Sequence, residues 1–199
     1  MEVLRPPVLD ALGSAPRALL ALRQWLALAA LCFAPLASAQ SVSKEDQVKA
    51  VFLFRLAQFV QWPTNAFPSP QSPLVIGVLG QNPFGRSLEF VVQDESAHGR
   101  SLHVVYLDGA SDPAACHILF ISRSESAQVR QVLARLRQKS ILTVSDLPEG
   151  FLENGGIVHF RTEDNKIKMT INADAAAAAG LVPDARLLRI ADVIKRSGP

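Results

Sequence analysis

The stretch Pro73-Leu-Val-Ile-Gly-Val-Leu-Gly80 is a short, almost continuous apolar run that ends in glycine. A run of this length, rich in β-branched residues, predicts a strand that is buried on both faces. The residues that follow, Pro83-Phe-Gly-Arg-Ser-Leu-Glu-Phe-Val-Val92, are interpreted as a helix. A buried strand followed directly by a helix is typical of the units that build a parallel sheet.

The same alternation continues downstream. Three more apolar runs predict strands, and an amphipathic stretch before the last of them predicts a helix. The strands are expected at Ser101–Leu107, His117–Ser122 and Ile141–Val144, and the helix at Ser124–Gln138. We therefore predict an α/β fold with a mostly parallel sheet that helices cover on both faces.

Beyond residue 156 the pattern changes to two strands joined by a short polar turn. Ile157–Arg161 and Lys166–Ile171 flank Thr162-Glu-Asp-Asn165, and the second strand alternates polar and apolar residues. This alternation predicts a β-hairpin with one solvated face, at the edge of the sheet. A helical tail is expected next, with an alanine helix over Asn172–Gly180 and a second short helix over Asp184–Ile194.

Upstream of the first strand lies a long helical stretch. Ser43 is a suitable N-cap, and the helix is expected to run to Trp62, where Pro63 stops it. Its apolar stripe is broader than one surface helix needs for contact with a core. Either this helix is nearly buried, or its surplus apolar surface contacts a second chain.

The N-terminus has the three parts of a secretory signal. Basic residues precede an apolar run of twelve residues, Trp25–Leu36, and the small-x-small sequence Ala37-Ser38-Ala39 follows it. Because about 20 apolar residues are needed to cross a bilayer, a membrane anchor is disfavoured. We expect residues 1–39 to be removed by cleavage after Ala39, which leaves residues 40–199 as a single exported domain.

Composition excludes several function classes. Without residues 1–39 the chain has 17 basic and 16 acidic side chains, so it lacks the positive charge of a nucleic-acid-binding domain. Cys116 is then the only cysteine, so no intramolecular disulfide can form. Because it opens the apolar run Cys116–Ile121, we expect a buried and inert thiol.

The sequence contains no recognisable catalytic or metal-binding motif. Its four histidines, at 98, 103, 117 and 159, lack the short spacing of a metal site, and no G-x-S-x-G sequence is present. We therefore expect no cofactor and no enzymatic activity. The loop Gly80-Gln-Asn-Pro-Phe-Gly85 follows the first strand, where α/β sheets bind ligands, so Gly80, Asn82 and Gly85 are pocket candidates. The motif is weak, however, and a structural turn is the favoured explanation of the same glycines.

Several segments together resemble the YfiR family of periplasmic regulators. They span about residues 47–195 and appear in the family's order. The matching segments are Lys49–Phe54, Phe59–Pro63, Pro73–Phe84, Cys116–Ile121, Ile141–Asp146, Gly155–Phe160, Ile171-Asn172, Gly180-Leu181, Leu187-Leu188 and Ile190-Ala191.

This resemblance implies a periplasmic repressor. YfiR-type proteins bind the periplasmic PAS-like domain of an inner-membrane diguanylate cyclase, hold it inactive, and so keep cyclic di-GMP and biofilm formation low. A related membrane signalling protein is the alternative partner. The single Cys116 departs from YfiR-type proteins that carry disulfides, so redox sensing through an internal disulfide is not expected here. The alternatives are a periplasmic small-solute-binding or sensor domain that uses the Gly80–Gly85 pocket, and a hydrolase with an unrecognised site.

Two regions are candidates for the partner-binding surface, because they carry more apolar surface than the fold needs. The same surface would also serve a homodimer. Leu188 is expected to belong to the core, whereas the surface residues are expected to be Phe52, Phe54 and Phe59 in the opening helix and Asn172, Ala177, Leu181 and Leu187 in the tail.

Overall fold

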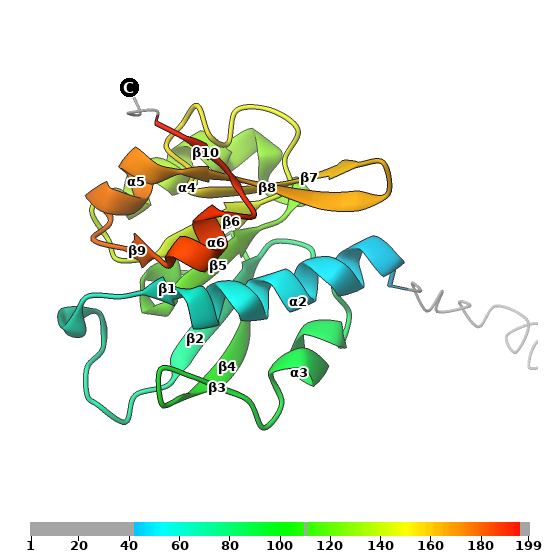
Figure 1. Cartoon of the computed structure of the whole chain (residues 1–199). Coiled ribbons are helices and arrows are strands. Elements are labelled where there is room, and N and C mark those ends of the chain that lie inside the picture. The colour runs from blue at the N-terminus through cyan, green and yellow to red at the C-terminus, as the bar shows by residue number, and fades with distance from the viewer. Residues whose placement is uncertain (1–41, 110, 196–199) are drawn as a thin grey trace, which may run out of the picture. The chain divides into compact units, whose positions relative to one another are not determined.

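The computed structural model describes residues 42–109 and 111–195 (Figure 1). The predicted secretory signal and its cleavage site after Ala39 lie outside these residues. Among the described helices, none combines the length and the apolar character that a membrane span requires.

The described residues form one eight-stranded mixed sheet, in the order β10-β8-β7-β6-β5-β2-β4-β3 (Figure 1). The pairs β2–β4, β2–β5, β5–β6, β6–β7 and β8–β10 are parallel, whereas β3–β4 and β7–β8 are antiparallel. The α/β class is therefore confirmed, with a sheet of mixed direction. The strands are β2 (Leu74–Leu79), β3 (Ser96–Ala97), β4 (Arg100–Leu107), β5 (Ile118–Ile121), β6 (Leu142–Ser145), β7 (Val158–Glu163), β8 (Lys166–Asn172) and β10 (Asp192–Ile194).

The predicted hairpin is present as β7 and β8, but its predicted place at the sheet edge is wrong. Residues 192–194 form β10, which pairs with the outer side of β8 and covers it. The predicted second tail helix is correspondingly short, because α6 covers only Ala185–Leu188. The free edge of β8 offers hydrogen bonds to β10, and Asp192 also contacts Arg161 at an Nη2–Oδ2 distance of 3.2 Å. These contacts outweigh the weak helical preference of the β-branched residues at 193 and 194.

The opening helix is α2 (Lys44–Phe59), and Ser43 is its N-cap as predicted. The Ser43 hydroxyl accepts a hydrogen bond from the backbone N–H of Asp46 at 3.0 Å. The helix ends earlier than expected, because residues 60–61 leave it to form β1 (Val60–Gln61). This short strand pairs with β9 (Val182–Pro183), so backbone pairing to the tail replaces the last helical turn.

The other helices are shorter than predicted. The helix after β2 is α3 (Ser87–Val92), and the loop before it takes no helical form. The stretch after β5 begins as the 3₁₀ helix η3 (Arg123–Gln128) and becomes α-helical only in α4 (Val129–Leu136). Two further short 3₁₀ helices are η1 (Thr64–Ala66) and η2 (Pro113–Ala115), and the alanine helix is α5 (Ala173–Ala178).

Two buried apolar clusters hold these elements together. Alternate residues of β5 contribute to different clusters: Ile118 and Phe120 to the first, and Leu119 and Ile121 to the second. Since successive side chains of a strand point to opposite faces, the clusters lie on opposite faces of the sheet. The first cluster also contains residues of α2, α3, α5 and α6, and the second contains residues of α4.

Candidate partner-binding site

The three predicted aromatic residues of α2 do not form one exposed face. The Phe54 side chain is only 8% exposed and belongs to the first apolar cluster. Phe52 is partly buried, with its ring centroid 5.9 Å from that of Phe160. Phe59 is also partly buried, and the Arg186 guanidinium lies 4.9 Å from its ring centroid. These rings mainly complete the domain's own core, because α2 crosses the sheet and is covered by the tail.

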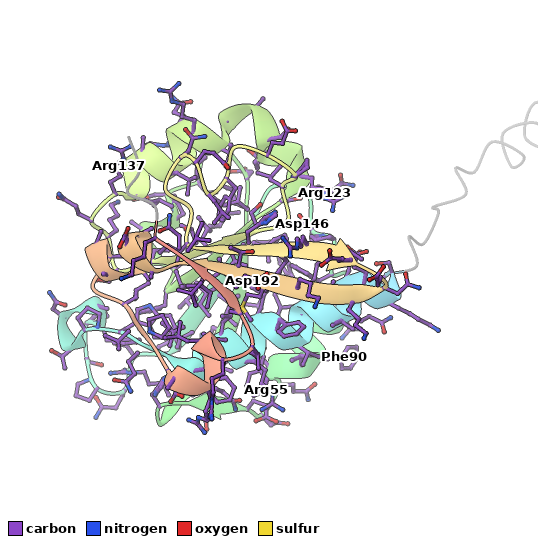
Figure 2. All side chains as sticks on the ribbon, turned by 45° about the horizontal axis from the view of Figure 1, so that its top comes forward. Arg55, Phe90, Arg123, Arg137, Asp146 and Asp192 are labelled. Atoms are coloured by element: carbon purple, nitrogen blue, oxygen red, sulfur yellow. The ribbon has the colours of Figure 1, made fainter. Side chains whose placement is uncertain are left out.

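The exposed apolar side chains near α2 are different ones. Val48 and Val51 are 45% and 43% exposed, and Phe90 of the adjacent helix α3 is 64% exposed. Figure 2 shows Phe90 at the surface, pointing away from the sheet. None of these three side chains is among the surface residues expected from the sequence. Their exposure follows from the sheet lying on the other side of α2, which only the tertiary arrangement shows.

In the tail, most of the predicted surface residues are buried. Leu181 and Leu187 are 3% and 2% exposed and belong to the first cluster, whereas Leu188 is only partly buried. Leu187 therefore lies in the core and not on the surface, because α6 turns it toward α2, whereas Leu188 packs against the core as expected. Asn172 is fully buried and acts as the N-cap of α5, where its Oδ1 accepts from the N–H of Ala175 at 3.1 Å.

Ala177 is the predicted tail residue that stays on the surface. Ala177 and Ala178 are exposed, while Ala176 on the other side of α5 is buried. A side-chain substitution at Ala177 therefore changes the surface without entering the core. This part of α5 is flat because its side chains end at Cβ, so another chain can approach the helix closely.

A cavity of about 260 Å³ lies beside this part of α5. Its apolar lining includes Leu133 and Leu136 of α4, Ala178 of α5, and Ala179, which follows α5. Arg137 and Lys139, which follow α4, add positive charge to its wall, and Figure 2 shows Arg137 at the surface there. The exposed face of α5 and this cavity thus form one continuous region, which we call the α5 surface.

The Gly80–Gly85 loop is a closed turn in which the candidate polar groups are already used. Asn82 Oδ1 accepts from the N–H of Phe84 at 2.9 Å, and Asn82 Nδ2 donates to the Gly85 carbonyl at 2.9 Å. A Cβ added at Gly80 would lie 2.3 Å from the Ser124 hydroxyl oxygen, and Gly80 has a φ of +87°. The glycine is therefore required by the turn and by the close approach of Ser124. These contacts fit the structural interpretation of the loop.

The structure also shows a buried charge cluster that the sequence reasoning missed. Lys49 of α2 is 2% exposed, and its Nζ lies 2.6 Å from Asp146 Oδ2 and 2.6 Å from Glu45 Oε1. Arg123 reaches the same Asp146 oxygen at 3.1 Å, and the two lie side by side in Figure 2. Asp146 follows β6, so this cluster fastens α2 to the carboxyl end of that strand.

The charges in this cluster stabilise one another. Burial by itself lowers the pKa of Lys49, but hydrogen bonds to Asp146 and Glu45 outweigh it and raise the pKa above its ordinary value. The hydrogen bond to Lys49 lowers the pKa of Glu45. Both shifts favour the ionised forms, so the cluster is a structural clamp in which the lysine stays protonated at neutral pH.

Two other potentially reactive side chains have structural surroundings. The Cys116 thiol is 4% exposed and fills the space above Gly77, and burial together with the charge of Asp112 raises its pKa to about 11. His117 is buried and stacks on Phe67 at a centroid distance of 4.3 Å. Its Nδ1 accepts a hydrogen bond from the N–H of Val75 at 3.0 Å. Burial lowers the pKa of His117 and the charge of Arg100 adds to this effect, whereas the hydrogen bond to the Ala66 carbonyl opposes it. Across residues 42–109 and 111–195, no group of His, Cys, Asp and Glu side chains has metal-binding geometry.

Comparison with known proteins adds one clear finding. No curated protein matches the chain. A family model described as YfiR/HmsC-like matches residues 46–192, which includes almost all of the described fold from α2 to the start of β10. Since the match covers well over half of the chain, this protein belongs to the YfiR/HmsC-like family.

Proposed function

We propose that this chain is a periplasmic repressor that acts by binding and not by catalysis. It binds the periplasmic, PAS-like domain of an inner-membrane diguanylate cyclase and holds the enzyme inactive, so that cyclic di-GMP stays low. The observation that carries this proposal is the family match over residues 46–192, because the family supports regulation of diguanylate cyclases from the periplasm. Cleavage after Ala39, which would release the domain into the periplasm, is part of the same proposal.

The α5 surface is the proposed contact with the cyclase. It combines exposed small side chains, at Ala177 and Ala178, with an adjacent cavity of about 260 Å³ whose walls are partly apolar and partly basic. Protein interfaces place anchor side chains in such pockets and surround them with flatter contacts. A side chain of the cyclase would fill the cavity, while its backbone approaches the alanine face of α5.

Co-expression with the cognate cyclase tests this proposal. Ala177→Asp adds a charge to the α5 surface. The matched control is Ala115→Asp in η2, which the strands β7, β6 and β5 separate from β8, the strand that α5 follows. Both alanines are exposed, so both variants are expected to keep the melting temperature of the parent. We expect Ala177→Asp to raise cyclic di-GMP and biofilm formation and Ala115→Asp to leave both low.

Two outcomes would count against the proposal. Full repression by a folded Ala177→Asp variant would remove the α5 surface as the contact. No effect of the parent chain on any co-expressed membrane cyclase would remove the repressor function itself. If the chain alone sediments as a dimer and the Ala177→Asp variant sediments as a monomer, this surface serves a homodimer.

Solute binding is the alternative function, and the Gly80–Gly85 loop gives it little support. The polar groups of Asn82 are used inside the loop, and Ser124 occupies the space beside Gly80. The cavity at the α5 surface is a better place to look for a solute. A rise in melting temperature with an added solute, abolished by filling the cavity with Ala178→Leu, would favour this alternative.

A further inference from the structure

The outer edge of strand β4 lacks a neighbouring strand over most of its length. On one side, residues 102–107 of β4 pair with all six residues of β2. On the other side, β3 pairs only with Arg100 and Ser101, so within the described residues the edge from Leu102 onward has no strand partner. Figure 1 shows β3 and β4 together at the lower end of the sheet, with α3 beside them.

The direction of the backbone groups along this edge follows from one hydrogen bond. The N–H of Gly80 donates to the carbonyl of Leu107 at 2.9 Å, so the backbone of Leu107 faces β2. Because the direction alternates along a strand, Leu102, Val104 and Tyr106 direct their N–H and C=O groups away from β2. These three residues thus present a row of donors and acceptors of the kind that a further strand would pair with.

An open groove of about 540 Å³ runs along the same edge. One wall is β4 from Ser101 to Val105, and the other comes from α3 and the loop after it. Natural sheet edges are usually protected by lysine, proline or a bulge. The sequence Leu102-His-Val-Val-Tyr-Leu107 contains neither lysine nor proline, and its pairing with β2 runs without a bulge. An accessible and unprotected edge is the structural requirement for strand addition by another chain.

The second wall of this groove is acidic. Glu89, Asp94 and Glu95 line it, and no lysine or arginine is among its lining residues. The Oε2 atom of Glu89 is buried, and it has no hydrogen-bond partner in the described part of the chain. The Glu89 carboxylate interacts with the Tyr106 hydroxyl, so its acceptor capacity is used only in part, and a cationic donor entering the groove would find the Oε2 atom free.

We propose that this groove binds an extended, basic segment of the regulated membrane protein, which adds to the sheet as a strand beside β4. The inference rests on the proposed function and adds a second contact, besides the α5 surface, through which that partner docks. The backbone of the segment pairs with Leu102, Val104 and Tyr106, and its lysine or arginine side chains meet the carboxylates of the opposite wall. A second copy of this chain fits less well, because its own acidic wall would approach the same carboxylates.

Synthetic peptides added to the mature domain test the proposal without knowledge of the partner's sequence. The probe is a short peptide in which lysine and valine alternate, and its controls are the same peptide with glutamate in place of lysine and one with alternate backbone N-methyl groups. We expect the lysine peptide to bind, and binding of the other two to be at least about tenfold weaker. The amides of Leu102, Val104 and Tyr106 should exchange more slowly when the lysine peptide is bound.

Variants of the groove complete the test. Glu95→Lys changes the charge of the wall at an exposed position and should weaken peptide binding by about tenfold. The matched control, Glu149→Lys, changes an exposed glutamate outside this groove and should bind as the parent does. Val104→Pro removes an outward N–H and should abolish binding; if it fails to fold, the N-methylated peptide answers the same question.

The results separate this inference from the proposed function. If Glu95→Lys loses both peptide binding and cyclase repression while Glu149→Lys keeps them, the strand-addition site is supported. If cyclase repression persists in Glu95→Lys, or if the N-methylated or glutamate peptide binds equally well, the groove is not the docking site, although the repressor function stands. Dimerisation that is lost in Val104→Pro would show that a second copy, and not a basic segment, occupies the edge.

Discussion

Replacing Lys49 with methionine removes the centre of the charge cluster that fastens α2 to β6. Lys49 is 2% exposed and Asp146 is 8% exposed, so the substitution leaves a buried carboxylate without its closest cation. Loss of one partner of a buried ion pair typically costs about 3–5 kcal/mol of unfolding free energy. Arg123 remains at 3.1 Å from Asp146, but its own side chain is 65% exposed, so it compensates only in part.

We therefore expect Lys49→Met to lose about 3 kcal/mol, at the lower end of that range. For a domain of this size the loss corresponds to a fall in melting temperature of roughly 6–12 °C. Urea unfolding monitored by circular dichroism measures the free energy, and a thermal scan measures the temperature. Lys44→Met is the matched control, because Lys44 lies on the exposed side of the same helix and should change stability by less than about 0.5 kcal/mol.

A second substitution distinguishes an unpaired charge from lost packing. In Lys49→Met/Asp146→Leu the buried carboxylate is also gone, and apolar replacement of a buried ion pair is often neutral or stabilising. We expect the double variant to recover most of the lost stability. If Lys49→Met costs less than about 1 kcal/mol, or if the double variant is less stable than the single one, the cluster is not the clamp that its distances indicate.

Three further predictions concern the tail and the two buried reactive side chains. Leu187→Ala should cost about 2–5 kcal/mol of unfolding free energy, whereas Ala177→Asp should cost less than about 0.5 kcal/mol; equal costs in urea unfolding would contradict the assigned burial. The pKa of His117 is lowered in the folded state, so its contribution to the free energy of unfolding is fully present above the ordinary value of 6.5. The free energy of unfolding should therefore fall as the pH drops below 6.5, and it should fall less steeply in His117→Gln. An identical slope in the two proteins would exclude His117 as the cause. Cys116, with its pKa raised to about 11, should resist alkylation at pH 8 until the domain unfolds, and a Cys116-linked dimer on a non-reducing gel would contradict its burial.

The regular middle of the fold could be predicted from the sequence because its signals are local. The apolar run at β2, the N-cap at Ser43 and the alternating residues of β8 each determine a local conformation with little help from elsewhere. The burial of Cys116 was predictable for the same reason, since the thiol opens a continuous apolar run.

Features that depend on distant residues could not be predicted in this way. Residues 192–194 become β10 only because β8 offers an unpaired edge, and a short β-branched segment by itself is equally compatible with a helix end. Lys49 resembles an ordinary solvated lysine until Asp146, 97 positions later, is placed beside it. The burial of Leu187 was not predicted, because neighbouring leucines in a short helix give no local sign of which one lies deeper in the core.

The pairing of β1 with β9 has a consequence for how the chain reaches its folded state. Val60 pairs with Pro183, so the first helix is completed by residues about 120 positions further along the chain. Contacts of such long range require closure of a large loop, and they form late and slowly. Before the tail has packed against α2, the apolar residues at the end of this helix are exposed to solvent and accessible to proteases. We therefore expect a chain that lacks residues 182–183 to be more sensitive to proteases than the complete chain.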